Sequence, residues 1–360
     1  MGLASHLQRL WFPEPLPFSG AEKPARLADG LLLAGLIPLS WLFRCLVAAR
    51  RQAYRRGWLA SQRLPVPVVV VGNITVGGAG KTPLTLYLAA ALRASGRRPG
   101  IVSRGYGGSQ DGVAAVTPEA LPTEVGDEPL LLARESGCPV WVGRDRSAAA
   151  RALLAAHPEC DLILCDDGLQ HYGLARDLEI AVCDGRGLGN GRLLPAGPLR
   201  EPRSRLNSVQ ALVGNGLAPR ALACATPAFA MDLEPGLFAD LHDPARRCGA
   251  AELSGRKLYA VAGIGHPPRF FQTLADLGLE VESRAFPDHH AYTPADLDFA
   301  RDGVLLTTAK DGVKCAPIYG GEAWVLPVAA RLTPDLSAFV LEKINGLTAA
   351  GHPGLPGVQG

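Results

Sequence analysis

Residues 66–88, VPVVVVGNITVGGAGKTPLTLYL, decide the fold of this chain. The apolar, β-branched run predicts a buried strand, and a glycine-rich turn and a Lys-Thr pair connect it to an apolar helical stretch. The backbone N–H groups of Gly77, Gly78 and Gly80 are free of side-chain obstruction, and the N-terminus of the next helix adds partial positive charge. This order predicts a phosphate-binding loop.

The loop residues expected to bind a nucleoside triphosphate are Thr75, Gly77, Gly78, Ala79, Gly80, Lys81 and Thr82. Lys81 can reach the outer phosphates, and the Thr82 hydroxyl can hold Mg²⁺. The strict pattern G-x-x-x-x-G-K-[ST] has glycine where this chain has Thr75. An ordinary glycine-rich turn between strand and helix is therefore the alternative.

Composition indicates a globular chain of 360 residues, long enough for two domains, with 48% hydrophobic and 19% charged residues. The net charge of +2 gives no electrostatic reason to expect a nucleic-acid partner. No feature indicates an obligate protein partner. The eight cysteines form no C-x-x-C pair, which favours reduced core thiols in a cytosolic setting.

An apolar segment near the N-terminus, residues 31–49 (LLLAGLIPLSWLFRCLVAA), precedes a cluster of arginines: Arg50, Arg51, Arg55 and Arg56. It is short for a membrane span and contains Pro38. A helix lying in the membrane interface fits better, with Trp41 and Phe43 at the headgroup boundary and the arginines facing anionic lipid. A helix packed on the protein's own core is the alternative.

Strands and helices alternate after the phosphate-binding loop. Apolar runs at 140–142, 162–165, 180–183 and 209–213 predict further buried strands, and 146–156 has a helical pattern. We therefore expect an α/β fold, with a P-loop NTPase-type, mostly parallel sheet that carries helices on both faces. Loops at the carboxyl ends of its strands would form the site.

Composition also predicts how the chain divides into domains. We expect an N-terminal amphipathic, membrane-associated helical segment at 1–60, a P-loop domain at 61–220, a linker rich in Pro, Gly and Ala at 221–255, a smaller α/β domain at 256–346 and a flexible tail at 347–360.

Two acidic pairs are candidates for chemistry. Asp166 and Asp167 end the apolar run 161–165, where a Walker B acid stands relative to a P-loop strand, so one of them is predicted to bind Mg²⁺; a solvated turn is the alternative. Asp127, followed by Glu128, can take a proton from an attacking hydroxyl beside the γ-phosphate, or it can simply cap the helix that follows.

Histidines and arginines supply further candidates. The sequence Asp288-His289-His290 allows metal binding, acid–base chemistry or an exposed loop, but no cysteine or other histidine lies nearby at zinc-ligand spacing. Guanidinium groups recur in the expected carboxyl-end loops and favour an anionic substrate: Arg104, Arg144, Arg146, Arg186, Arg192 and Arg200.

Several segments together resemble the tetraacyldisaccharide 4'-kinase family, the lipid A 4'-kinases of Gram-negative bacteria. The similar segments are VVVVGNITVGGAGKTP (68–83), SRGYGG (103–108), GDEPLLL (126–132), DDGLQHYGLARDLEI (166–180), GNGRLLPAGPLRE (189–201), GIGHPPRFF (263–271), DHH (288–290) and TTAKDGVKC (307–315). They occur in the family's order over nearly all of 66–315. Thr75 then fits the family's own loop, GNxxxGGxGKT.

The resemblance implies a function. It is the ATP- and Mg²⁺-dependent phosphorylation of the 4'-hydroxyl of a tetraacylated glucosamine disaccharide 1-phosphate, giving lipid IVA, by a peripheral or monotopic protein at the cytoplasmic face of the inner membrane. A lipid A disaccharide precursor with four acyl chains stays in the bilayer. An enzyme with an interfacial helix can therefore reach the headgroup without extracting the lipid.

The resemblance also implies residue roles. Asp127 resembles the general base, paired with His289 rather than His290, while Lys81 holds the outer phosphates. Thr82, Asp166 and Asp167 resemble the groups around Mg²⁺. Weaker candidates for substrate, phosphate or ion contacts are Arg104, Tyr106, Glu128, Gln170, His171, Arg200 and Glu201.

Two other functions share some of these features. A membrane-attached nucleotide switch would also have the loop and the anchor, but a GTPase of that kind carries an N-K-x-D motif, which this sequence lacks. A soluble small-molecule kinase would not need the N-terminal apolar segment.

Overall fold

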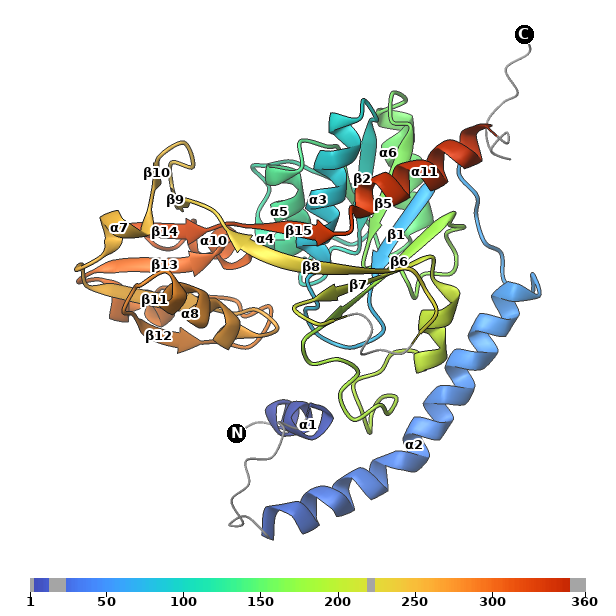
Figure 1. Cartoon of the computed structure of the whole chain (residues 1–360), viewed down its shortest axis with the longest axis horizontal. Coiled ribbons are helices and arrows are strands. Elements are labelled where there is room, and N and C mark those ends of the chain that lie inside the picture. The colour runs from blue at the N-terminus through green and yellow to red at the C-terminus, as the bar shows by residue number, and fades with distance from the viewer. Residues whose placement is uncertain (1–2, 13–23, 219–223, 350–360) are drawn as a thin grey trace.

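The computed structural model describes residues 3–12, 24–218 and 224–349. It consists of a larger and a smaller α/β lobe, each built on its own sheet, with a long helix along the outer side of the larger lobe (Figure 1).

The larger lobe contains a sheet formed by β1 (Val68–Gly72), β2 (Pro99–Ser103), β3 (Ala114–Val116), β4 (Val140–Val142), β5 (Leu162–Asp166), β6 (Leu178–Asp184), β7 (Ala211–Asn215), β8 (Ala228–Pro235) and β15 (Val328–Thr333). Among the described residues, the strand order is β15-β8-β7-β6-β1-β5-β2-β4-β3. Neighbours from β4 to β8 run parallel, and the edge strands β3 and β15 are antiparallel.

Helices cover both faces of this sheet. They are α3 (Lys81–Ala94), α4 (Pro122–Val125), α5 (Asp127–Glu135), α6 (Arg146–Ala156), α11 (Leu336–Ala349) and the 3₁₀ helix η1 (Arg203–Ser208). In β1, Val69 and Val71 join the core formed with α3, whereas Val68 and Val70 join the core formed with α6. A strand that is buried on both faces has a continuous apolar sequence, which is why the sequence predicted this sheet. The parallel pairing confirms the expected α/β fold.

The smaller lobe contains β9 (Phe238–Asp240), β10 (Arg247–Cys248), β11 (Leu258–Ala262), β12 (Glu282–Ala285), β13 (Val304–Thr308) and β14 (Ala323–Leu326). Their order is β10-β9-β14-β13-β11-β12. The helices of this lobe are α7 (Ala250–Leu253), α8 (Pro267–Asp276), α9 (Pro294–Leu297), α10 (Ala309–Cys315) and the 3₁₀ helix η3 (Asp298–Ala300).

The chain passes between the lobes twice, from β8 to β9 and from β14 to β15, and the paired strands β8 and β15 extend toward the smaller lobe (Figure 1). The segment 221–255, expected as a linker, thus contains β8, β9, β10 and α7. The end of the expected smaller domain, 256–346, returns to the larger lobe, where Leu336 and Val340 of α11 are buried in the core with α3. Composition does not predict that β8 and β15 pair with each other, because the two strands are distant in sequence.

Within the described residues before β1, the chain forms helices α1 (Leu3–Trp11) and α2 (Pro24–Arg55). Helix α2 continues through Pro38 and is longer than the apolar segment predicted. Its stretch Asp29–Arg55 is long and apolar enough to cross a membrane, and only 6% of its most apolar window is buried, so it is not a core helix. Ser40 anchors α2 to the larger lobe by donating to Leu193 O at 2.8 Å and accepting from Ala196 N at 2.9 Å.

The C-terminal tail expected at 347–360 lies outside the described residues from position 350 onward, and residues 347–349 complete α11.

Candidate active site

The phosphate-binding loop, residues 73–80, leads from β1 directly into α3. Gly77 and Gly80 both have φ of 91°, a region that favours glycine. A Cβ on Gly80 would lie 2.4 Å from Nδ2 of Asn215, so only glycine fits there. Thr75 shapes the loop: its Oγ1 accepts from Asn73 Nδ2 at 3.3 Å and its backbone pairs with Leu199.

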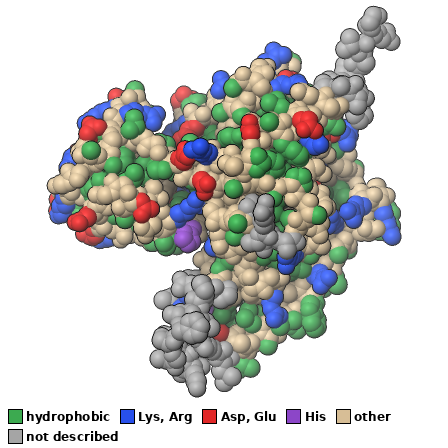
Figure 2. Space-filling view, viewed as in Figure 1, with side chains coloured by type: hydrophobic (Ala, Val, Ile, Leu, Met, Phe, Trp, Pro, Cys, Tyr) green, Lys and Arg blue, Asp and Glu red, His purple; other side chains and the backbone are tan. Residues whose placement is uncertain are grey.

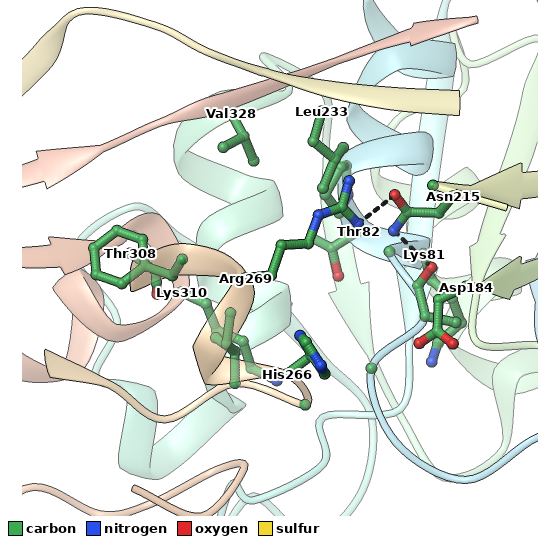
Figure 3. Close-up of a pocket in the computed structure, with 18 of the residues that line it drawn as sticks. Lys81, Thr82, Asp184, Asn215, Leu233, His266, Arg269, Thr308, Lys310 and Val328 are labelled. Carbon is green, nitrogen blue, oxygen red and sulfur yellow. Dashed lines mark hydrogen bonds between the residues drawn. The ribbon is translucent and has the colours of Figure 1, made fainter. Parts of the chain in front are cut away.

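A cavity of about 610 Å³ opens between the lobes at this loop. Gly78, Ala79, Gly80, Lys81 and Thr82 line it on one side. The apolar walls come from both lobes: Leu131, Leu233, Ile264, Phe270, Leu326 and Val328. The cavity thus has a phosphate-binding end and an apolar end, and its volume is typical of ligand sites. These properties suit a nucleotide. In Figure 3, Lys81 and Asp184 lie on one side and Thr308 and Lys310 on the other.

Asp167, which follows β5, is surrounded by cations. Its carboxylate lies 3.8 Å from Lys81 Nζ and 3.2 Å from Nη1 of Arg200. Burial acts to raise the pKa of Asp167, but the charges of Lys81 and Arg200 outweigh it and lower the pKa. The group therefore stays ionised at the phosphate end of the cavity. Its φ of 47° is unusual for a non-glycine residue.

Asp166, at the end of β5, is fully buried. The Thr85 hydroxyl donates to its Oδ1 at 3.0 Å, whereas Oδ2 is buried without a hydrogen-bond partner among the described residues. Burial, and next the charge of Glu128, raise the pKa of Asp166 to about 7. Asp166 thus has one carboxylate oxygen that is free within the described part of the chain, and it is followed in sequence by the ionised Asp167. Thr82 lies one turn before Thr85 on α3. Carboxylate and hydroxyl oxygens of this kind are the ligands that Mg²⁺ prefers.

Asp127 and His289 meet across the two lobes. Asp127 begins α5 and is 5% exposed, and His289 Nδ1 lies 3.1 Å from its Oδ1 and 3.2 Å from its Oδ2. Burial acts to raise the pKa of Asp127, but the His289 hydrogen bond and the charge of Lys310 lower it to about 2. Burial acts to lower the pKa of His289, but the bond to Asp127 outweighs it and raises the pKa. We call these two residues the dyad.

The neighbours of the dyad have distinct surroundings. The Tyr106 ring packs edge-on against His289 with centroids 4.8 Å apart. His290 instead lies 3.1 Å from Asp296 and stacks on Phe286. The structure therefore brings His289, and not its neighbour, to Asp127.

Gln170 and Glu201 form a support beneath the loop. Gln170 Nε2 donates to Asn73 O and to Glu201 Oε1, both at 3.0 Å. Glu201 is 1% exposed, accepts from the Tyr172 hydroxyl and lies 3.4 Å from Arg205 Nε. These contacts hold the phosphate-binding loop at Asn73, and neither Gln170 nor Glu201 lines the cavity.

The remaining weaker candidates lie at different points around the site. Burial and the charge of Arg146 lower the pKa of His171 to about 4, and its Nε2 lies 3.6 Å from Asp145. Arg104 is exposed just after β2. Glu128 lines the cavity and accepts from Lys310 at 2.9 Å.

Sequence reasoning missed several cavity residues. Arg269 of α8 donates to Asn215 Oδ1 at 2.7 Å, and Asn215 Nδ2 donates to Ala79 O at 3.1 Å, so the smaller lobe is tied to the phosphate-binding loop (Figure 3). His266 and Lys310 line the same cavity. His266 and Arg269 lie in the segment GIGHPPRFF and Lys310 in TTAKDGVKC, which both supported the resemblance. The spacing of their residues matches no known catalytic or binding pattern.

Comparisons with known proteins agree on one family. Residues 32–345 match the family model of tetraacyldisaccharide-1-P 4'-kinase. A tetraacyldisaccharide 4'-kinase of Dechloromonas aromatica is 55% identical over 97% of this chain and 100% of its own length. One of Chromobacterium violaceum is 57% identical over 88% of this chain and 95% of its own length.

A solved structure is similar over most of the chain. It is LpxK from Aquifex aeolicus in complex with ATP, 30% identical, with a TM-score of 0.74 over 87% of this chain and 99% of that one. The resemblance predicted from the motifs is thus confirmed. This chain belongs to the tetraacyldisaccharide-1-P 4'-kinase family.

Proposed function

We propose that this chain transfers the γ-phosphate of ATP to the 4'-hydroxyl of tetraacyldisaccharide 1-phosphate, giving lipid IVA in lipid A biosynthesis. Membership of the family supports the activity. The observation that carries the chemistry is the dyad, a carboxylate and an imidazole in contact at 3.1 Å, one from each lobe.

The nucleotide lies in the interlobe cavity, with its phosphates at Gly78–Thr82 and its base against the apolar walls. Lys81 supports the outer phosphates. Bound Mg²⁺, the usual partner of such kinases, neutralises phosphate charge, and Thr82, Asp166 and Asp167 are the residues that would hold it.

The dyad acts on the acceptor. Asp127 takes the proton of the sugar hydroxyl as its oxygen bonds to the γ-phosphorus and the bond from that phosphorus to the bridging oxygen of the leaving ADP breaks. His289 fixes the carboxylate by its hydrogen bond. A base of low pKa suffices, because in a loose phosphoryl-transfer transition state the hydroxyl becomes strongly acidic only late. Most of the catalysis comes from positioning and charge neutralisation.

The acyl chains of the substrate place the reaction at a membrane surface. Large apolar side chains of α2 are exposed: Leu31, Leu39, Trp41, Leu42 and Leu46. They suit insertion into the acyl boundary, with the arginines at the end of α2 facing anionic headgroups. We place the protein at the cytoplasmic face of the inner membrane, as a peripheral or monotopic protein with no obligate protein partner and no nucleic acid.

The test incubates the detergent-solubilised chain with γ-labelled ATP, Mg²⁺ and tetraacyldisaccharide 1-phosphate, and follows the lipid by thin-layer chromatography. Label should appear on the lipid with the unaltered chain and disappear with Lys81→Ala. The matched control is Lys257→Ala, because Lys257 forms an exposed ion pair with Asp302 on the smaller lobe. A folded, ATP-binding chain that leaves the lipid unlabelled would favour a nucleotide switch instead.

A further inference from the structure

Lys310 lies in the first turn of α10 on the smaller lobe, immediately after β13, and its side chain is 14% exposed. Its ammonium group lies 2.9 Å from Oε1 of Glu128 and 3.0 Å from Oδ1 of Asp288. It also lies 3.4 Å from Nε2 of His289 and 4.0 Å from Asp127. A single cation thus contacts both members of the dyad and a carboxylate beside each of them.

These carboxylates come from opposite lobes. Glu128 follows Asp127 at the start of α5 in the larger lobe, and Asp288 precedes His289 in the smaller lobe. An ammonium group has three N–H donors, and here they point to Glu128, Asp288 and His289. Lys310 therefore contacts one carboxylate from each lobe, each adjacent in sequence to a member of the dyad.

The same contacts determine the tautomer of the histidine. An ammonium group has no acceptor, so a hydrogen bond between it and Nε2 of His289, 3.4 Å away, requires Nε2 to accept. The proton of the neutral ring then lies on Nδ1, which faces the Asp127 carboxylate at 3.1 Å. The hydrogen bond of the dyad thus has its donor on the histidine and its acceptor on the aspartate.

Lys314 does not duplicate this role. It lies 3.6 Å from Asp127 but also 2.8 Å from Asp311 of its own helix, and no contact with His289 is found among the described residues. Lys310 alone of these two lysines contacts the ring.

We propose that Lys310 is a positioning residue that fixes the orientation and tautomer of His289 in the dyad. This inference rests on the proposed function, because it assigns Lys310 to the base of that reaction. Lys310 acts through His289 and Asp127 and does not itself receive the proton.

The charges around the ring predict the direction in which the pKa of His289 changes when Lys310 is replaced. The groups facing His289 are Asp127 from α5, Asp288 from its own loop, Lys310 from α10 and the Tyr106 ring from the loop after β2. The positive charge of Lys310 opposes protonation of Nε2, while Asp127 favours the imidazolium. Loss of Lys310 with the dyad intact must therefore raise the pKa of His289. If Lys310 only held the two lobes together, its loss would separate His289 from Asp127 and lower the pKa of His289.

The experiment labels the histidine rings of the full-length chain with ¹⁵N in detergent and assigns the His289 signals with His289→Gln. In the unaltered chain, the neutral ring should carry its proton on Nδ1. Lys310→Met should raise the pKa of His289 by about one unit, and kcat for lipid phosphorylation should fall by about tenfold or more. Lys310→Arg keeps the charge and should keep the pKa close to its original value, which separates the role of charge from a general loss of structure.

The control is Lys257→Met, which removes an exposed lysine of the same lobe and should leave both measurements unchanged. A neutral ring protonated on Nε2, or a pKa that falls or stays constant in Lys310→Met, would overturn the proposal. Because the titration is read without turnover, this failure is distinct from failure of the unaltered chain to phosphorylate the lipid.

Discussion

At the scale of single residues, the site surrounds one carboxylate with cations and leaves another without a salt bridge among the described residues. Asp127 is paired with His289, Lys310 and Lys314, whereas Asp166 keeps one oxygen without a partner among the described residues. The first arrangement favours a charged base, and the second favours a cation that arrives with the nucleotide phosphates. We therefore propose different roles for these two acids, because their surroundings differ.

We expect Asp127→Asn to lower kcat by about 10²- to 10⁴-fold while the affinity for ATP changes little, because a base contributes mainly in the transition state. Steady-state kinetics with the lipid acceptor and titration of ATP binding by calorimetry measure the two effects. A comparable loss of ATP affinity would instead assign Asp127 to nucleotide binding or to the fold.

At the scale of elements, α2 is fixed to the larger lobe and exposes apolar side chains along its length. Among its described residues, Ser40 is buried and bonded to the larger lobe, and Phe43 packs against the core there. Arg51 donates to Ser208 Oγ at 3.0 Å. Other apolar side chains remain exposed over much of its length. Figure 2 shows the rest of the molecule from the face seen in Figure 1, with acidic, basic and histidine side chains where the two lobes meet. Charged side chains thus occur where the lobes meet, whereas large exposed apolar side chains recur along α2.

We expect Leu42→Glu to weaken binding to vesicles that contain anionic lipid by about tenfold or more, because burying a leucine contributes about 1.5–3 kcal/mol. Vesicle co-sedimentation measures it. Leu237→Glu is a matched control, since Leu237 is 59% exposed on the connection to the smaller lobe and Leu42 is 58% exposed. Equal losses in both variants would show that α2 has no special part in membrane binding.

At the scale of the whole molecule, the backbones of the two lobes approach each other closely at one point of the phosphate-binding loop, Gly78, beside the cavity. A Cβ on Gly265, which follows β11, would lie 2.7 Å from the backbone N of Gly78 and 3.0 Å from its Cα. Backbone at that distance cannot move aside like the end of a flexible side chain. Gly265 thus sets how closely the smaller lobe approaches the loop.

We expect Gly265→Ala to lower kcat by about tenfold or more, because a displacement of about 1 Å at a reacting centre has a large effect on rate. Small-angle scattering should show a more open chain with ATP than for the unaltered protein. Gly320→Ala is the control, since no atom lies within 4 Å of its added Cβ. Unchanged kcat in Gly265→Ala would mean that the loop tolerates a wider separation.

The sequence by itself determined the phosphate-binding loop, the parallel α/β fold and the family, because each rests on short segments whose own residues fix their local structure. It also named Asp127 and His289 as a pair through resemblance alone. The tertiary structure decided what those residues contact. Asp127 and His289 are 162 positions apart, and nothing in the spacing of either segment states that they meet.

The same reason explains what the sequence did not predict. Lys310, Arg269 and Asn215 come together only because both lobes line the same cavity. β15 joins the first sheet after the chain has completed the second. Local pattern specifies strands, helices and loops, because those depend on near neighbours. The pairing of distant strands and the approach of two lobes depend on packing, which only the folded chain has.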